Sequence, residues 1–206
     1  MVWILDLCSG LGGASEAFTK HPHWEVVRIE NNEKLASVPH TRILDVQHWI
    51  DWLPGLLLEM GGPPSLVIAG PPCVGFSNAY SSPRSIARRE GIPYEPDMGI
   101  VEDCIDIIDH IRSIEPNLYW VIENVAGAVN DFKIHLGEFR QKIGPFCLWG
   151  IFPHIALPPY WKHSKYDGDS WSSDPLRANK RALWPLEVSQ ALLESVMTQS
   201  TLSRWC

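Results

Sequence analysis

The chain has no run of the roughly 20 consecutive apolar residues that a membrane-spanning helix requires. Its apolar stretch at residues 2–7 is too short for a secretory signal, and no basic region precedes it. We therefore expect a soluble intracellular protein with no membrane association. A length of 206 residues, of which 45% are hydrophobic, fits one domain with a full core.

Paired cysteines are also absent. The five cysteines are an odd number, they are widely spaced, and none forms a CxxC or a Cys/His cluster. Zinc sites and disulfide frameworks need such spacing, so we predict free thiols in a reducing compartment and no metal site.

Positive charge is scarce, since 17 Lys and Arg face 24 Asp and Glu, for a net charge of −7. Phosphate binding depends on clustered cations, so local groups matter more than the total. One group comprises Arg84, Arg88 and Arg89, for which a solvated helix face is an equally good interpretation. A second basic group comprises Lys162, Lys165, Arg177, Lys180 and Arg181.

Short runs rich in Val, Ile and Leu alternate with segments of helical spacing. The runs lie at residues 2–7, 26–29, 66–69 and 119–122. They predict buried parallel strands, and the helical spacing is clearest at residues 14–19, 100–114 and from Pro185 onward. The expected fold is an α/β, Rossmann-like, mostly parallel sheet with helices on both faces. We divide the chain into an α/β domain at 1–145, an irregular segment at 146–183 and a closing helix at 184–206.

A glycine turn and two acidic residues together indicate a binding site for a nucleoside. The first strand runs into Asp6-Leu7-Cys8-Ser9-Gly10-Leu11-Gly12-Gly13, at the sheet edge where open α/β proteins bind ligands. Glu30 closes the second strand and could accept from both hydroxyls of a ribose. Asp45 closes the third expected strand and could accept from an adenine amino group. Each acid alone is more often a solvated strand end.

A cysteine and a glutamate follow two further strands. Cys73 comes directly after a buried strand and behind Pro71 and Pro72, which stiffen the loop that carries the thiol. Glu123 ends the next strand, so a parallel sheet would bring it to the same rim. Either residue alone would more often be a buried thiol or a surface acid.

Together, these segments resemble the cytosine-5 DNA methyltransferases. The matching pieces are the glycine turn, Glu30, Asp45, Gly70-Pro71-Pro72-Cys73 with Phe76-Ser77, and Glu123-Asn124-Val125, in the family's order. The likeness covers residues 2–128, and residues 181–196 resemble the closing helix of small phage-type members. It implies a protein of the cytoplasm of a prokaryote or a phage-infected host cell.

The resemblance implies a cofactor, S-adenosylmethionine, with S-adenosylhomocysteine as product, and DNA as partner. Cys73 and Glu123 are the implied catalytic residues. The implied cofactor-binding residues are Cys8, Ser9, Gly10, Leu11, Gly12, Glu30, Asn31, Asp45, Val46, Gly70 and Pro72. The candidate substrate-binding residues are Ser77, Asn124, Val125, Arg84, Arg88, Arg89, Lys162, Arg177 and Arg181. The segment at 79–96 resembles the family's loop that closes over an extruded base.

The chain departs from the family pattern in three places. Cys8 stands where an adenine-stacking aromatic is common, and Cys147-Leu148-Trp149-Gly150 occupies the expected position of a paired-arginine motif. A full target-recognition domain is lacking. We therefore expect a short or relaxed target sequence, or recognition supplied by a homodimer or a partner protein. Aromatic residues suited to stacking on bases are Trp149, Tyr160, Trp161 and Trp171, although they could equally complete the core.

Three alternatives stay open. The same fold could act on RNA or a free nucleotide, it could transfer a modified methyl group, or it could be a catalytically silent paralogue that stimulates a partner. Intact Cys73 and Glu123 argue against the silent paralogue.

Overall fold

A seven-stranded sheet forms the centre of the protein. The computed structural model describes residues 2–163 and 173–202 of the chain. The strands are β1 (Val2–Leu7), β2 (Trp24–Glu30), β3 (Thr41–Ile43), β4 (Leu66–Ala69), β5 (Tyr119–Val125), β6 (Gln141–Ile143) and β7 (Phe146–Ile151). Their order is β3-β2-β1-β4-β5-β7-β6, with β1 to β5 parallel and β7 antiparallel to both of its neighbours.

The strands are apolar on both faces because helices cover both. In β1, Trp3 and Leu5 belong to one hydrophobic cluster, and Ile4, which points to the opposite face, belongs to the other. Strand β4 alternates in the same way, with Val67 in the first cluster and Ile68 in the second. Such continuous apolar runs are typical of a parallel sheet between two helical layers.

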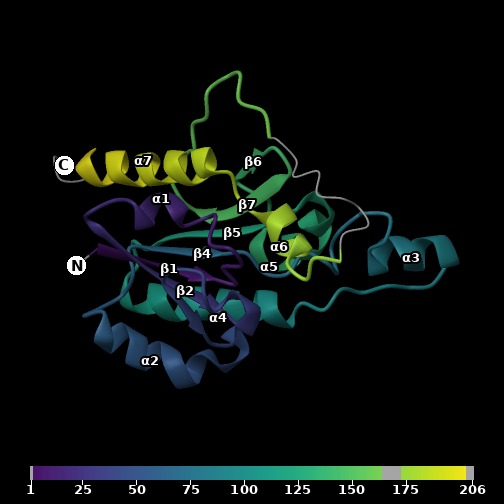
Figure 1. Cartoon of the computed structure of the whole chain (residues 1–206), viewed down its shortest axis with the longest axis horizontal. Coiled ribbons are helices and arrows are strands. Elements are labelled where there is room, and N and C mark those ends of the chain that lie inside the picture. Colours follow the sequence, from purple (N-terminus) through teal and green to yellow (C-terminus); the bar gives the residue numbers. More distant parts are fainter. Residues whose placement is uncertain (1, 164–172, 203–206) are drawn as a thin grey trace.

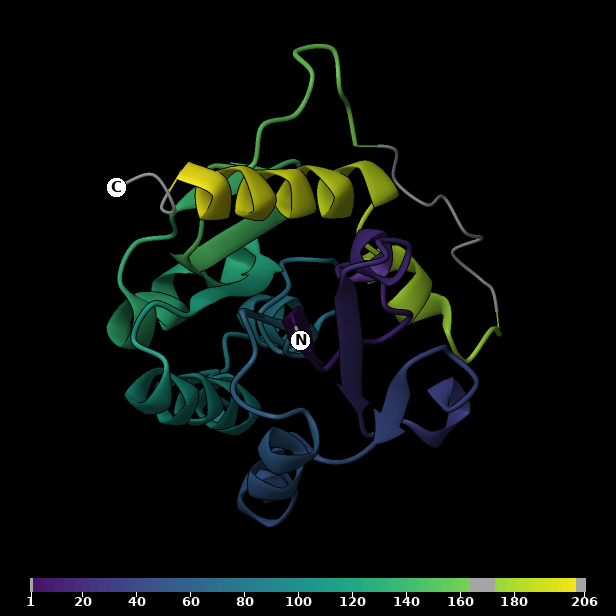
Figure 2. The ribbon, with the colours of Figure 1, turned by 90° about the vertical axis from the view of Figure 1, so that its left-hand side faces the viewer.

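The described residues form seven α-helices. They are α1 (Glu16–Thr19), α2 (Trp49–Glu59), α3 (Pro83–Glu90), α4 (Gly99–Ile114), α5 (Val129–Leu136), α6 (Arg177–Ala182) and α7 (Leu186–Leu202) in the described residues. Helices α2, α4 and α5 pack on one face, and α1 and α7 pack on the other (Figures 1 and 2). Helix α3 projects from the body (Figure 1). The expected Rossmann-like α/β fold is confirmed.

The strand order sets the place for a ligand. From β1 the chain moves outward to β2 and β3, then returns to β4 on the other side of β1. In open α/β sheets, ligands bind at the carboxyl ends of the strands where the order reverses in this way. The glycine turn after β1, Glu30 at the end of β2 and the cysteine loop after β4 all lie at that edge.

The structure corrects two local expectations and adds a helix that the sequence did not predict. Residues 146–151, assigned to the irregular segment, form β7, because their apolar side chains complete the sheet beside β5. The helix expected at 14–19 is only the single turn of α1. The segment at 79–96 contains the helix α3, which Ser82 begins by accepting a hydrogen bond from the Ser85 amide at 3.2 Å. In the described part of the chain, no helix has the length and apolar character needed to cross a membrane.

Besides its buried apolar side chains, the closing helix α7 has one serine that links it to the segment after the glycine turn. Ser189 is fully buried, and its hydroxyl donates to the Ala14 carbonyl at 2.7 Å and accepts from the Ala17 amide at 3.0 Å. These two bonds join α7 to the first turn of α1. The position of α7 therefore depends on the segment that follows the glycine turn.

Ser189→Ala should lower the free energy of unfolding by about 1–3 kcal/mol, because it leaves the buried Ala17 amide without its acceptor. The matched control is Ser195→Ala on the same helix, whose hydroxyl bonds only the Leu192 carbonyl of that helix. Its effect should stay within about 0.5 kcal/mol. Urea denaturation followed by circular dichroism measures both, and equal effects would show that α7 is held by apolar packing alone.

Candidate active site

The glycine turn joins β1 to α1 through residues with left-handed backbone. Cys8 has φ of 53°, Gly10 of 54° and Gly12 of 76°. The turn is held to the sheet by the Ser9 amide, which donates to the Ile29 carbonyl at 3.1 Å, and is closed by the Gly12 amide, which donates to Ser9 at 2.8 Å. Left-handed φ is inexpensive for glycine but strained for Cys8.

A buried arginine supports this turn from beneath. Arg28 is 1% exposed, and its guanidinium donates to the Gly12 carbonyl at 2.7 Å, the Ser15 hydroxyl at 2.8 Å and the Pro39 carbonyl at 2.9 Å. Ser15 in turn donates to Asp6 at 2.6 Å. Burial raises the pKa of Asp6 to about 6, although the Ser15 bond and the charge of Arg28 lower it. We did not predict this network from the sequence. The feature that could have indicated it is Arg28 itself, a charged residue inside the apolar run of β2.

Gly12→Ala should destabilise the protein more than Gly61→Ala. The two glycines have nearly the same φ, 76° and 74°, but a Cβ at Gly12 would lie 2.2 Å from Arg28 Cζ, whereas Gly61 has nothing within 4 Å. Both variants should lose about 1–2 kcal/mol to left-handed backbone strain. Gly12→Ala should lose about 1–3 kcal/mol more through overpacking. Equal unfolding free energies in urea would mean that Arg28 can move aside at no cost.

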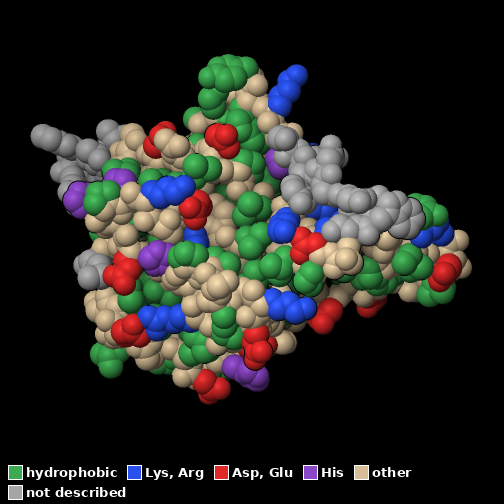
Figure 3. All heavy atoms as spheres, viewed as in Figure 1, with side chains coloured by type: hydrophobic (Ala, Val, Ile, Leu, Met, Phe, Trp, Pro, Cys, Tyr) green, Lys and Arg blue, Asp and Glu red, His purple; other side chains and the backbone are tan. Residues whose placement is uncertain are grey.

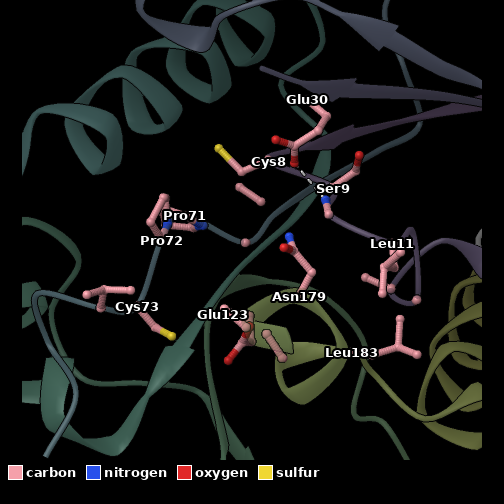
Figure 4. Close-up of a pocket in the computed structure, with 18 of the residues that line it drawn as sticks. Cys8, Ser9, Leu11, Glu30, Pro71, Pro72, Cys73, Glu123, Asn179 and Leu183 are labelled. Carbon is pink, nitrogen blue, oxygen red and sulfur yellow. Dashed lines mark hydrogen bonds between the residues drawn. The ribbon is translucent and has the colours of Figure 1, made fainter. Parts of the chain in front are cut away.

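Glu30 is held to the glycine turn by one carboxylate oxygen and to the loop after β2 by the other. Oε2 accepts from the Gly10 amide and Oε1 from the Asn32 amide, each at 2.9 Å, and a dashed line marks a Glu30 bond in Figure 4. Each oxygen keeps a further lone pair for a ligand hydroxyl. Asp45 uses Oδ1 to accept from the Gln47 amide at 3.0 Å and so caps the short helix that follows β3.

These elements surround one cavity of about 560 Å³ at the carboxyl edge of the sheet. Ten of the eleven expected cofactor residues line it, namely Cys8, Ser9, Gly10, Leu11, Glu30, Asn31, Asp45, Val46, Gly70 and Pro72. Gly12 does not line it, because it packs on Arg28. Cys73, Glu123, Ser77, Val125, Arg177 and Arg181 line the same cavity. Figure 4 shows Cys73 and Glu123 opposite the glycine turn across this space.

The Cys73 loop is rigid on both sides of the thiol. The Cys73 carbonyl accepts from the amides of Phe76 at 3.1 Å and Ser77 at 2.9 Å, which closes a turn. Before the thiol, the side chain of Asn124 donates to the Pro71 carbonyl at 3.0 Å. Asn124 is 1% exposed and was expected to bind substrate, but it holds the cysteine loop to β5 instead.

The carboxyl group of Glu123 has an unusually high pKa. Burial raises its pKa to about 7, and a hydrogen bond from the side chain of Trp184 lowers it. At neutral pH the protonated and ionised forms are therefore both populated, which suits a group that gives and takes a proton. Trp184 was not among the residues singled out from the sequence, because no local pattern links it to Glu123.

The surroundings of Cys73 hold the pKa of its thiol above the ordinary value. Burial raises the pKa of the Cys73 thiol, and the negative charge of Glu123 raises it further, whereas a backbone hydrogen bond and the charge of Arg181 lower it. Two like charges in one cavity disfavour each other. The state that combines a thiolate at Cys73 with a protonated Glu123 avoids this repulsion.

Opposite substitutions at Glu123 and Arg181 should shift the pKa of Cys73 in opposite directions. Glu123→Gln removes a negative charge and should lower it, and Arg181→Gln removes a positive charge and should raise it. The measurement is the pH dependence of iodoacetamide alkylation, with the modified peptide identified by mass spectrometry. Shifts in the same direction, or none, would contradict this electrostatic account.

The other expected phosphate contacts lie outside the cavity. Arg84 forms an ion pair with Asp131 at 2.6 Å and donates to the Gly127 carbonyl, so it fastens α3 to the body. Arg89 lies over the Tyr80 ring at 4.0 Å. The remaining expected contacts in the described part, Arg88 and Lys162, are exposed, and Lys165 and Trp171 lie outside the described residues. Figure 3 shows the face of the protein seen in Figure 1, where Lys and Arg side chains are scattered among acidic ones.

Two further expectations concerned aromatic and cysteine residues. Trp149 is fully buried at 4.9 Å from the Phe132 ring, so it belongs to the core and cannot stack on a base. Tyr160 is 84% exposed. The Cys8 thiol interacts with the Cys104 thiol of α4, and this contact and burial raise its pKa well above the ordinary value. Among residues 2–163 and 173–202, no three His, Cys, Asp or Glu side chains are grouped as a metal site.

Comparison with known proteins yields similar solved structures. No protein-family model and no curated protein sequence matches the chain. One similar structure is an Escherichia coli prophage protein assigned as a DNA modification methyltransferase, with 20% identity and a TM-score of 0.42 over 68% of this chain. Another is a methyltransferase of Entamoeba histolytica, with 16% identity and a TM-score of 0.36 over 62% of this chain. The matched region spans 39% of each of those chains.

Proposed function

We propose that this chain transfers a methyl group from S-adenosylmethionine to carbon 5 of a cytosine in DNA. The observation that carries the proposal is one cavity that holds a glycine turn with Glu30 on one side and the Cys73 thiol with the Glu123 carboxyl on the other. The sequence resemblance to the cytosine-5 DNA methyltransferases supplies the substrate and the position of transfer.

The glycine-turn side of the cavity fits the cofactor. Ser9 Oγ is buried and has no hydrogen-bond partner among the described residues, and it lies on a turn that lines the cavity. Such an atom calls for a polar ligand group. Glu30 offers two carboxylate oxygens to ribose hydroxyls, and Asp45 offers its remaining oxygen to an amino group. When bound there, S-adenosylmethionine supplies a methyl group on a positively charged sulfur.

The Cys73 side fits activation of a cytosine ring. Carbon 5 of cytosine is a poor nucleophile until attack at carbon 6 breaks the ring conjugation. The Cys73 thiolate would form a bond to carbon 6 as the ring electrons move to N3, where Glu123 donates or shares its proton. Carbon 5 then takes the methyl group, and a base removes the carbon 5 proton. The bond to Cys73 breaks as the double bond between carbons 5 and 6 re-forms, and N3 returns its proton to Glu123.

Access to both ring atoms requires an extruded base. Carbons 5 and 6 are blocked inside a duplex, and extrusion costs a few kcal/mol. Arg177 and Arg181 of α6 line the cavity, and they would hold the phosphates on either side of the extruded nucleotide. Trp149 is buried in the core and cannot read bases, so few side chains near the cavity are left to recognise a DNA sequence. We therefore propose a target sequence of about one to three bases.

Two variants should separate chemistry from cofactor binding. Cys73→Ser should abolish transfer to DNA with nearly unchanged S-adenosylmethionine affinity, because the proposed role of the thiol is to contact the base, whereas Glu30 and the glycine turn contact the adenosine. Glu30→Ala should weaken S-adenosylmethionine binding by roughly 10- to 150-fold, since it removes charge-assisted hydrogen bonds. Calorimetry measures the affinities, and bisulfite sequencing of a mixed DNA pool measures transfer and its sequence context.

Trapping provides the decisive control for the covalent step. DNA that contains 5-fluorocytosine should form a stable adduct with the wild-type chain and none with Cys73→Ser, because fluorine at carbon 5 cannot be removed as a proton. Transfer by Cys73→Ser, or no adduct with active wild-type protein, would overturn the mechanism. Methylation confined to an RNA pool would overturn DNA as the substrate.

A further inference from the structure

Asn179 of α6 lies on the wall of the cavity, next to the glycine turn. It is half-buried, and a Cβ added at Gly10 would be in van der Waals contact with its Nδ2 atom, at 3.5 Å. In Figure 4 its carboxamide projects from α6 into the space between the glycine turn and Glu123. Among the described residues, the Asn179 side chain has no hydrogen-bond partner, so its donor and its acceptor can both serve a ligand.

The position of α6 is fixed on both sides of Asn179. At the start of the helix, Asp174 forms an ion pair with Lys180 at 2.6 Å. Beyond its end, the backbone of Trp184 lies against the glycine turn, where a Cβ added at Gly13 would be 2.8 Å from the Trp184 carbonyl oxygen and 2.9 Å from its amide nitrogen. Only glycine permits this approach. Asn179 is therefore presented to the cavity by a segment that packs on the glycine turn.

The positive and negative charges that line the cavity come from different elements. The acidic residues lie on strands or just after them, and they are Asp6, Glu30, Asp45 and Glu123. Both arginines of the lining, Arg177 and Arg181, lie on α6. A negatively charged group of a ligand is therefore favoured beside α6 and disfavoured beside the ends of the strands.

The sulfur of S-adenosylmethionine carries three substituents that need different surroundings. In the proposed function, the adenosine lies against Glu30 and the methyl group faces the base that Cys73 attacks. The third substituent is an amino acid chain that ends in an ammonium group and a carboxylate group. Neither Glu30 nor Cys73 can donate a hydrogen bond to that carboxylate, so a further polar residue of the cavity has to bind it.

We propose that Asn179 binds the carboxylate of this amino acid chain, with Nδ2 as the donor. The proposal rests on the proposed function, in which the glycine turn and Glu30 hold the adenosine. A carboxylate at this place accepts a charge-assisted hydrogen bond and lies in the positive field of α6. Arg177 and Arg181 remain able to bind phosphates. Asn179 lies outside both segments that resemble the cytosine-5 DNA methyltransferases, residues 2–128 and 181–196, so the assignment comes from the fold.

The test compares two ligands that share the adenosine and the sulfur. S-adenosylhomocysteine carries the amino acid chain, and 5′-methylthioadenosine carries a methyl group in its place. In calorimetry, Asn179→Ala should weaken binding of S-adenosylhomocysteine on the order of tenfold and leave the affinity for 5′-methylthioadenosine unchanged. The matched control is Glu30→Ala, which should weaken both ligands by the same factor because both contain the ribose.

A second variant keeps the shape of the side chain. Asn179→Asp replaces the donor with a negatively charged oxygen, so it should weaken S-adenosylhomocysteine more than Asn179→Ala does, with 5′-methylthioadenosine again unchanged. A third ligand isolates the carboxylate, namely the amine analogue of S-adenosylhomocysteine that lacks this group. It should bind wild type and Asn179→Ala equally.

Three results would overturn the proposal in distinguishable ways. An S-adenosylhomocysteine affinity that both Asn179 variants leave unchanged, while Glu30→Ala weakens both ligands, would reject the role of Asn179 and keep the proposed function. Equal weakening of the amine analogue would reject the carboxylate contact in favour of the ammonium group. If neither S-adenosylhomocysteine nor 5′-methylthioadenosine binds the wild-type chain, the proposed cofactor site is wrong and the role of Asn179 is rejected with it.

Discussion

A buried guanidinium beneath the glycine turn is the interaction on which the rest of the site depends. Arg28 lies in the interior, where an unpaired charge would be prohibitive, and it is tolerated because carbonyl and hydroxyl oxygens surround it and the Glu16 carboxylate forms an ion pair with it at 3.3 Å. Those oxygens belong to the turn, to the start of α1 and to the loop before β3. The turn in turn holds Glu30 and the backbone of residues 183–184. The glycine turn that Arg28 supports therefore contacts both Glu30 and the segment at residues 183–184, which line the same cavity.

The second constraint is electrostatic and acts between Cys73 and Glu123. Both groups are partly shielded from water, and the ionised form of either raises the energy of the other. The charge of Arg181 in α6 offsets part of this repulsion by lowering the pKa of Cys73. Helix α6 thus adjusts the protonation of a cysteine in the loop that follows β4.

The fold explains two of the places where the sequence departs from the family pattern. The position expected for a paired-arginine motif is filled by the apolar strand β7, whose Trp149 completes the core beside Phe132. Positive charge in the cavity comes from α6 instead, with Arg177 and Arg181. Cys8 turns to Cys104 of α4 where an aromatic would offer a flat surface. The side chains at this sheet edge thus come from other parts of the chain than the family pattern predicts.

The amino-acid sequence by itself determined the strands β1, β4 and β5, the glycine turn, and the common edge that unites Glu30, Cys73 and Glu123. These features follow from local rules, because apolar runs form buried strands and parallel strands end at the same rim. Only the tertiary structure decided that Arg28 supports the turn, that Asn124 holds the Pro71 carbonyl and that Trp149 is core. Those contacts join segments far apart in the chain, and their partners are selected by packing and by the need to satisfy buried polar groups, which no local spacing encodes.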